Sequence, residues 1–242
     1  MPVERFRLRR TGGDGFLEVM TVDGGAVDCD EPPPVLAAPF LPTALAGLVR
    51  LATGVRPVPE GLLPRERPVV FFANHGSHLD APLIWAALPA DWRAVTRPVA
   101  ARDYWEEGAV RRFVSRRLLR AVLIERRKIS ARNNPLAPLR EALGRGESLI
   151  LFPEGTRSPD GTVGAFRSGL HHLVRDRPEV PLVPVFLDNL SRILPKGELL
   201  PVPFIANLFV GAAIRMRPDE PKDAFLERAR AAVVALGTAP QS

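Results

Sequence analysis

The sequence is short of cysteine. Cys29 is the single cysteine among 242 residues, so the chain cannot form an internal disulfide. A chain with one cysteine fits a reducing compartment without requiring one. No Cys/His spacing typical of a zinc site occurs, which excludes a zinc-finger type of module.

The sequence also lacks a long apolar run. Residues 35–49 and 199–214 are uncharged, but both are shorter than the roughly 18 residues that a spanning helix needs, and prolines interrupt both. Residues 1–10 have no apolar core and do not read as a signal peptide. We therefore expect the two uncharged runs to attach the protein peripherally to a membrane. The alternative is that both are buried in the core.

The composition is that of a folded protein with an excess of basic residues. Hydrophobic residues make up 46% of the chain and the net charge is +6, which favours nucleic acid, a membrane surface or phosphorylated substrates as partners. No nucleic-acid motif is present, so we expect an anionic membrane surface and no nucleic acid. Basic residues cluster between 111 and 128, where Glu125 is the single acid. We expect a helix over 109–120 to carry part of this cluster and to contact anionic lipid. The alternative is an ordinary packed helix whose basic face is solvated.

The chain divides into an extension and a domain. Residues 1–34 form an N-terminal extension of unknown role, with a hairpin expected around the glycine turn at 11–15 and a stiff joint at the prolines 32–34. Residues 35–242 are expected to form one domain. Its predicted strands lie at 68–73, 93–97, 121–125, 148–152, 181–187 and 207–214, and its predicted helices at 78–88, 103–119, 135–144, 168–176 and 221–236. This alternation predicts an α/β fold in which helices flank a central, largely parallel or mixed sheet.

A histidine and an aspartate follow the first of these strands. The segment 74–80 reads NHGSHLD, which places His75 at the strand end and Asp80 five positions later. An imidazole whose tautomer is fixed by a carboxylate can act as a general base. Ser77 and Asp80 also fit an ordinary capping box. A metal site made by His75, His78 and Asp80 is a further alternative, but the order H-x-x-H-x-D is not the H-x-H-x-D-H of metallo-β-lactamase-like hydrolases.

No nucleophile accompanies this histidine. The sequence has no G-x-S-x-G motif, and Cys29 lies in the extension. We therefore expect His75 to activate the hydroxyl of a substrate directly, without a covalent enzyme intermediate.

A second polar segment follows the strand at 148–152. Glu154, Gly155, Thr156 and Arg157 follow one another there. Glycine permits a close approach of the ligand to the backbone, and the arginine fork suits a phosphate. Glu154 is expected to orient Arg157 or a substrate hydroxyl, and the alternative is a structural turn held by an internal Glu–Arg pair. Because both polar segments follow buried strands, we expect them to share one site.

In order and spacing, these segments resemble the motifs of the glycerolipid acyltransferases, the family of 1-acylglycerol-3-phosphate and glycerol-3-phosphate acyltransferases. His75 and Asp80 match the family's H-x-x-x-x-D motif, and 152–157 match its glutamate–glycine motif. The segment 123–126, which ends in Arg126, is similar to the family's F-I-D-R with Leu for Phe and Glu for Asp. The family's last motif resembles the proline-containing run 180–185. The resemblance covers roughly residues 45 to 215.

The resemblance implies a glycerol-3-phosphate acyltransferase-like fold and transfer of an acyl group from a thioester to a glycerolipid hydroxyl. It implies His75 as the base, Asp80 as its partner, and Arg126 and Arg157 as the residues that hold the acceptor's phosphate. We expect 1-acylglycerol-3-phosphate as the lysophospholipid acceptor, and acyl-CoA or acyl-carrier protein as the co-substrate, with no metal or other cofactor. Glycerol-3-phosphate, another lysolipid such as a lyso-aminolipid, and a non-catalytic lipid-binding role remain alternatives. The expected location is the periphery of the membrane, on its cytoplasmic face.

Overall fold

A computed structural model describes residues 7–10, 17–20, 40–125, 134–158, 161–188 and 206–238. The chain divides into two units, Met1–Ala37 and Ala38–Ser242. In the first unit, β1 (Arg7–Arg10) pairs antiparallel with β2 (Leu17–Met20), which confirms the predicted hairpin. Its glycine turn lies outside the described residues. The boundary at residue 34 and the role of the extension stay predictions.

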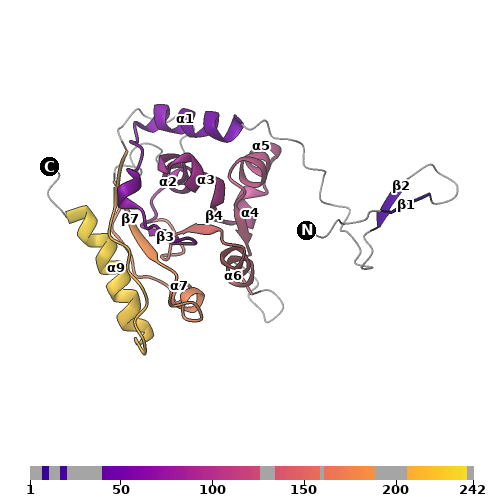
Figure 1. The fold of residues 1–242 in the computed structure, drawn as a ribbon. Coiled ribbons are helices and arrows are strands. Elements are labelled where there is room, and N and C mark those ends of the chain that lie inside the picture. The colour runs from indigo at the N-terminus through magenta and orange to yellow at the C-terminus, as the bar shows by residue number, and fades with distance from the viewer. Residues whose placement is uncertain are drawn as a thin grey trace. The chain divides into compact units, whose positions relative to one another are not determined.

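The second unit is built on a six-stranded sheet in the order β5-β4-β6-β3-β7-β8 (Figure 1). The first five strands run parallel, and β8 runs antiparallel to β7. This arrangement confirms the predicted α/β fold with a mixed sheet. In sequence order, the strands are β3 (Val70–Ala73), β4 (Thr96–Ala101), β5 (Val122–Ile124), β6 (Ser148–Leu151), β7 (Leu182–Asp188) and β8 (Asn207–Val210).

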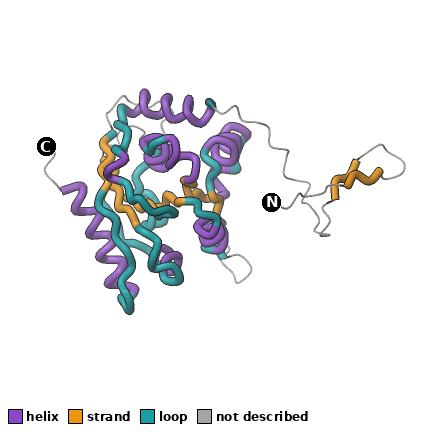
Figure 2. The backbone as a smooth tube through the Cα atoms, in the orientation of Figure 1, coloured by secondary structure: helices purple, strands orange, loops and turns teal. Residues whose placement is uncertain are grey.

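Helices cover both faces of the sheet (Figures 1 and 2). One core cluster joins the sheet to α1 (Leu41–Thr53), α2 (Asp80–Ala87) and α3 (Ala90–Val95), and the short helix η1 (Glu60–Leu62) precedes β3. A second core cluster joins the sheet to α6 (Ala137–Gly144), α7 (Gly169–Val174) and α9 (Lys222–Thr238). The sheet is therefore the middle layer of three.

The residues of β3 alternate between these two layers. Phe71 points to the cluster that contains α2 and lies edge-on to Trp92, with ring centroids 5.9 Å apart. Phe72 points to the opposite cluster and lies edge-on to Phe166 at 6.2 Å. Each buried side chain of this size contributes on the order of 1.5–3 kcal/mol. Burial on both faces explains why the strand is apolar throughout rather than alternating.

The elements predicted at 93–97 and 103–119 differ in the structure. The strand expected at 93–97 begins only at Thr96, because α3 extends to Val95 and buries Trp92 against the sheet. The single helix expected at 103–119 is broken at Gly108, which has a φ of 87°. It forms α4 (Arg102–Trp105), α5 (Ala109–Phe113) and the π-helical turn η2 (Val114–Leu118).

The uncharged run at 35–49 contributes most of its residues to α1. Proline is tolerated in the first turn of a helix, so Pro42 does not interrupt α1. Ala46 is buried, whereas Leu48 and Leu51 are 63% and 84% exposed. One face of α1 therefore packs in the core, and another exposes large apolar side chains to solvent. Of the second run, residues 199–205 lie outside the described residues, and Asn207–Val210 form β8, so the strand predicted at 207–214 ends four residues earlier. No helix in the described part of the chain is long and apolar enough to cross a membrane.

The last helix ends two residues later than predicted. It was predicted over 221–236, but α9 continues past Gly237 to Thr238. The ring of Phe186 on β7 packs directly against Gly237, and a Cβ at that position would lie 2.6 Å from the ring. This glycine therefore allows the helix to approach the sheet, rather than ending the helix.

Candidate active site

The order of the strands brings the two polar segments together. β3 and β6 are parallel neighbours, so the loops that follow them leave the same edge of the sheet. The backbone N–H of Ser158 donates to the carbonyl of His75 at 2.7 Å, and the N–H of His75 donates to Oε1 of Glu154 at 3.0 Å. The expectation that both segments share one location agrees with this geometry.

His75 and Asp80 form a hydrogen-bonded pair. Nδ1 of His75 lies 2.7 Å from Oδ2 of Asp80. The same oxygen accepts the backbone N–H groups of Gly76 at 2.7 Å and Ser77 at 2.9 Å. Asp80 is fully buried, and the His75 side chain is 15% exposed. The carboxylate therefore fixes the tautomer of the ring and leaves Nε2 of His75 as the nitrogen that can exchange a proton.

Ser77 and Asp80 also form part of the capping box that the sequence offers as an alternative. α2 begins at Asp80, whose carboxylate reaches back to the N–H of Ser77, as the acidic residue of a capping box does. The hydroxyl of Ser77 accepts the N–H of Leu79 at 3.2 Å. One carboxylate thus serves the backbone of its own loop and the imidazole at once.

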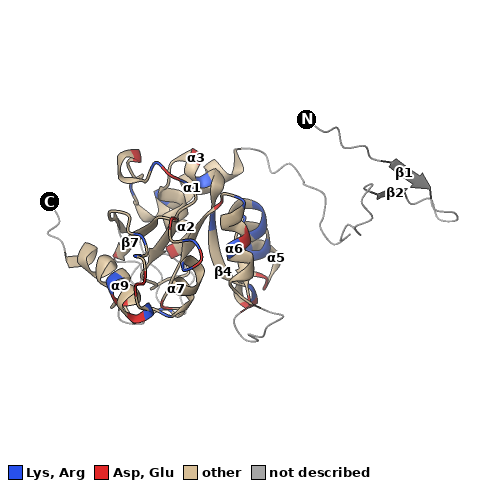
Figure 3. Cartoon of the chain, turned by 60° about the horizontal axis from the view of Figure 1, so that its bottom comes forward, with Lys and Arg blue, Asp and Glu red and all other residues tan. Residues whose placement is uncertain are grey.

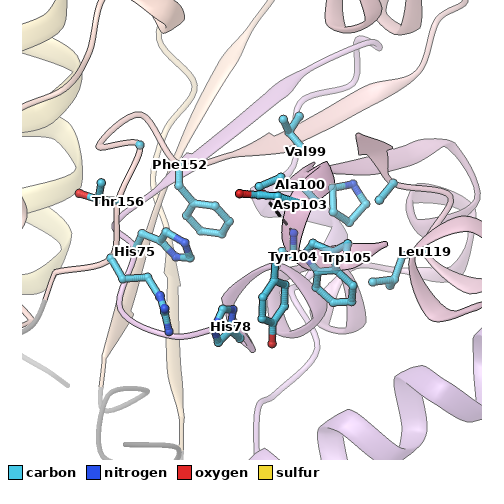
Figure 4. Close-up of a pocket in the computed structure, with 16 residues that line it drawn as sticks. His75, His78, Val99, Ala100, Asp103, Tyr104, Trp105, Leu119, Phe152 and Thr156 are labelled. Carbon is cyan, nitrogen blue, oxygen red and sulfur yellow. Dashed lines mark hydrogen bonds between the residues drawn. The ribbon is translucent and has the colours of Figure 1, made fainter. Parts of the chain in front are cut away.

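Phe152 fixes the plane of the imidazole. Its ring stacks on that of His75, with centroids 4.2 Å apart and an angle of 17° between the planes (Figure 4). The aromatic residue comes from the end of β6, and the histidine from the end of β3. Phe152 belongs to the second polar segment by sequence, but nothing local in the sequence shows that it contacts the histidine 77 positions earlier.

Glu154 contacts the backbone and not Arg157. Its Oε1 accepts the N–H of His75, and its Oε2 accepts the N–H of Gly164 at 3.2 Å. The residue is 7% exposed, and burial raises the pKa of its carboxyl group, although both N–H donors act in the opposite direction. No ion pair links Glu154 to Arg157 among the described contacts, which corrects the internal Glu–Arg pair considered from the sequence.

Gly155 has the backbone conformation that its residue type permits. Its φ is 73°, in the left-handed region. A Cβ added to it would lie 2.8 Å from Nε of Arg167, which donates to the carbonyl of Glu154 at 2.9 Å. Arg167 therefore supports the loop from behind, and glycine leaves room for it.

A cavity of about 320 Å³ opens beside this pair (Figure 4). His75, His78 and Tyr104 line its polar part together with the three residues that follow Glu154, namely Gly155, Thr156 and Arg157. Thr156 and Arg157 are exposed. The remaining wall is largely apolar and consists of Ala81, Pro98, Val99, Ala100, Ala101, Asp103, Trp105, Leu119, Ala121 and Phe152. The arrangement places a proton-accepting group between a cationic opening and an apolar interior.

His78 lines the cavity but does not join a metal-binding set. Its ring stacks on Tyr104, with centroids 4.0 Å apart and an angle of 5° between the planes. Burial, together with the positive charges of Arg157 and other neighbours, lowers the pKa of His78 to about 4, so the ring is neutral at physiological pH. No cluster of three potential metal ligands occurs among the residues that the structure describes.

One predicted binding residue cannot be placed. Arg126 lies outside the described residues, as do the basic residues that follow it up to 133. β5 ends at Ile124, two positions before Arg126, and the strand itself is close to the one predicted at 121–125. A role for Arg126 in binding phosphate stays a prediction.

Comparison with known proteins identifies the family. A model of the acyltransferase family matches residues 56–188, more than half of the chain and a span that includes both loops of the cavity. The chain belongs to the acyltransferase family.

Named relatives of this acyltransferase-family chain are distant. It is 27% identical to the chloroplastic 1-acyl-sn-glycerol-3-phosphate acyltransferase BAT2 of Brassica napus, over 66% of this chain and 41% of the relative. It is 31% identical to Taffazin of Dictyostelium discoideum, over 57% of this chain and 50% of that protein. The chain thus spans half or less of the length of these two curated relatives.

A solved structure shares the fold. The crystal structure of the 1-acyl-sn-glycerophosphate acyltransferase PlsC from Thermotoga maritima matches with a TM-score of 0.64. The match covers 84% of this chain and 82% of that chain, at 23% sequence identity. At this identity the likeness supports the fold alone.

Proposed function

We propose that this protein is an O-acyltransferase that moves a fatty acyl group from a thioester to the free hydroxyl of 1-acylglycerol-3-phosphate, forming phosphatidic acid. The observation that carries the proposal is the His75–Asp80 pair at 2.7 Å, set at a cavity with a cationic opening and an apolar wall. Relatives named 1-acyl-sn-glycerol-3-phosphate acyltransferases support the choice of acceptor.

The proposed reaction uses one base and no covalent enzyme intermediate. Nε2 of His75 takes the proton of the acceptor hydroxyl while its oxygen attacks the thioester carbonyl. Asp80 accepts the Nδ1 hydrogen bond and stabilises the imidazolium that forms. The tetrahedral intermediate collapses with cleavage of the carbon–sulfur bond. The departing thiolate receives the proton from His75, and the enzyme returns to its starting state.

The acceptor's phosphate would be held by arginine. Arg157 is exposed and lines the cavity. Its guanidinium offers a planar fork of donors that matches a phosphate. Arg126 is the second proposed phosphate ligand, on the grounds of its motif. The acyl donor, acyl-CoA or acyl-carrier protein, would place its chain along the apolar wall.

An acceptor panel tests the proposal. The purified protein is given one labelled acyl thioester with 1-acylglycerol-3-phosphate, glycerol-3-phosphate, other lysophospholipids and a lyso-aminolipid in parallel. His75→Ala should lower turnover by about 10²–10⁴-fold, whereas His172→Ala, which removes a histidine from α7 outside the cavity, should not. Near-normal turnover by a folded His75→Ala variant would exclude the mechanism. Acylation of no acceptor would favour the non-catalytic lipid-binding role.

We further propose that the protein adsorbs to the cytoplasmic face of an anionic membrane. Phe40, Leu48 and Leu51 at and within α1 expose large apolar side chains, as do Val110 and Phe113 of α5. Arginines gather on α5 and its continuation η2 (Figure 3). Apolar side chains beside basic ones suit an anionic lipid surface, at roughly 1 kcal/mol for each basic residue near it.

Vesicle sedimentation tests the adsorption. Binding should rise with the fraction of anionic lipid and fall with added salt. Replacing Leu48 and Leu51 together by serine should weaken binding without lowering the melting temperature, since both side chains are already exposed. Binding that is insensitive to lipid charge and to salt would refute this proposal.

A further inference from the structure

A stack of three side chains joins the loop of His75 to two helices. The ring of His78 lies parallel to that of Tyr104 on α4, with centroids 4.0 Å apart. The guanidinium of Arg111 on α5 lies over the same tyrosine, 4.4 Å from its ring centroid. Tyr104 therefore contacts a residue of the His75 loop through its ring and a cationic residue of α5 through the same ring.

The stack gives the loop a contact with α4 that its hydrogen bonds do not provide. The hydrogen bonds from Ser158 and to Glu154 tie His75 to the loop after β6. The bonds to Asp80 are made within the loop itself. His78, midway between His75 and Asp80, carries the ring contact of this loop with α4, on the side where the cavity is lined by Tyr104 and Trp105 (Figure 4).

The charges around the stack favour this arrangement. Arg111 is 44% exposed, and its ion pair with Glu107 is long, at 3.4 Å, with the acid 76% exposed. A pair of that kind is weak, so the guanidinium remains free to interact with the face of the tyrosine ring. His78 is neutral because of burial and the nearby arginines, and a neutral imidazole can stack here without repelling Arg111.

We propose that Tyr104 is a positioning residue, which holds the His75–Asp80 loop by stacking on His78 and is itself held by Arg111. Tyr104 and Arg111 lie outside the motifs by which the chain resembles its family, and His78 stands at an unspecified position within H-x-x-x-x-D. The expected effect of Tyr104 on kcat rests on the proposed function. Its expected effect on the position of the His75 ring does not. Small displacements of a catalytic group cost activity steeply, with about 1 Å costing on the order of 10²-fold.

Proton NMR of the full-length protein tests the geometry directly. An imidazole Nδ1 proton bonded to a carboxylate resonates far downfield of the amides, and the His75 proton is assigned by its loss in His75→Ala. Tyr104→Phe keeps the aromatic face and should retain the signal. Tyr104→Ala should lose or broaden it, and Arg111→Ala should weaken it. Arg102→Ala removes the same charge from α4, and no described contact joins Arg102 to Tyr104, so this control should leave the signal intact.

Kinetics provide the second measurement. Tyr104→Ala should lower kcat about ten- to hundredfold with a smaller change in KM, and Tyr104→Phe should restore kcat. If Tyr104→Ala does not fold, His78→Ala removes the same contact from the other side and should have the same two effects. A retained signal together with unchanged kcat in a folded Tyr104→Ala or His78→Ala variant would overturn the proposal. If the wild type acylates nothing, the proposed function fails, while the NMR comparison still decides the role of Tyr104.

Discussion

Glu154 shows how a motif residue can act through the backbone. Its two carboxylate oxygens accept N–H groups from His75 and Gly164, on two different loops. From the sequence we expected it to orient Arg157 or a substrate hydroxyl. Since both oxygens already have backbone partners and the side chain is buried, we now expect its main effect on the position of His75.

Replacing Glu154 by glutamine separates these two roles. The amide keeps one acceptor oxygen but presents an NH₂ group to the other backbone N–H, which leaves a buried donor unpaired at a cost of about 1–3 kcal/mol. We expect a lower melting temperature and a lower kcat, with little change in the KM of the acceptor. Steady-state kinetics and thermal unfolding measure both. A raised acceptor KM at constant kcat would instead indicate direct contact with the substrate.

His78 gives the fold a dependence on pH. Burial, followed by the charges of Arg157, His75 and Arg111, lowers its pKa from 6.5 to about 4. Between these pH values the unfolded chain holds more protons at this site than the folded chain, so stability is lost as the pH falls.

Phenylalanine at position 78 tests that dependence. His78→Phe keeps an aromatic ring against Tyr104 but cannot be protonated. We expect its melting temperature to fall less between pH 6.5 and pH 4 than that of the wild type. Equal losses in the two proteins would show that other groups account for the acid sensitivity.

At the scale of helices, two glycines should respond in opposite directions to alanine. Gly47 lies inside α1, and nothing approaches within 4 Å of where its Cβ would be, so Gly47→Ala should stabilise the protein by about 0.5–1 kcal/mol. Gly237 faces the ring of Phe186, which a Cβ would approach to 2.6 Å. Gly237→Ala should destabilise it by about 1–3 kcal/mol through overpacking. Chemical denaturation of both variants provides the comparison, and stabilisation by Gly237→Ala would contradict the close packing of α9 on β7.

At the scale of the whole molecule, the two units should be separable. Every described residue of the cavity and of both core clusters belongs to Ala38–Ser242. A chain that begins at Ala38 should therefore keep the melting temperature and the specific activity of the full chain. A clear loss of either would show that residues 1–37 take part in the fold or the reaction.

The sequence predicted those features that depend on local patterns. The buried strands at 68–73 and 148–152, the histidine and aspartate after the first, and the glycine turn after the second are all recognisable from residue type and spacing. Their meeting at one edge follows from the parallel pairing of β3 and β6.

Contacts between residues that are far apart in the sequence could not be predicted from such local patterns. Phe152 stacks on His75, and Tyr104 stacks on His78, although nothing near either aromatic residue marks its partner. The close packing of Gly237 could not be predicted locally either, because its neighbour Phe186 is 51 positions away. The strand at 93–97 was misplaced for a similar reason, since burial of Trp92 against Phe71 favours a helix where the local residues favour a strand.

The central place of β3 has a consequence for synthesis. Both of its neighbours, β6 and β7, come later in the chain, and β7 ends at Asp188. Until β6 and β7 have been synthesised, β3 has no neighbouring strand on either side, although His75 and Asp80 are already part of the nascent chain. Because long-range strand pairing is slow to form, the apolar residues of β3 stay unpaired during much of translation. The nascent chain therefore needs protection from aggregation longest at the strand that precedes the His75–Asp80 loop.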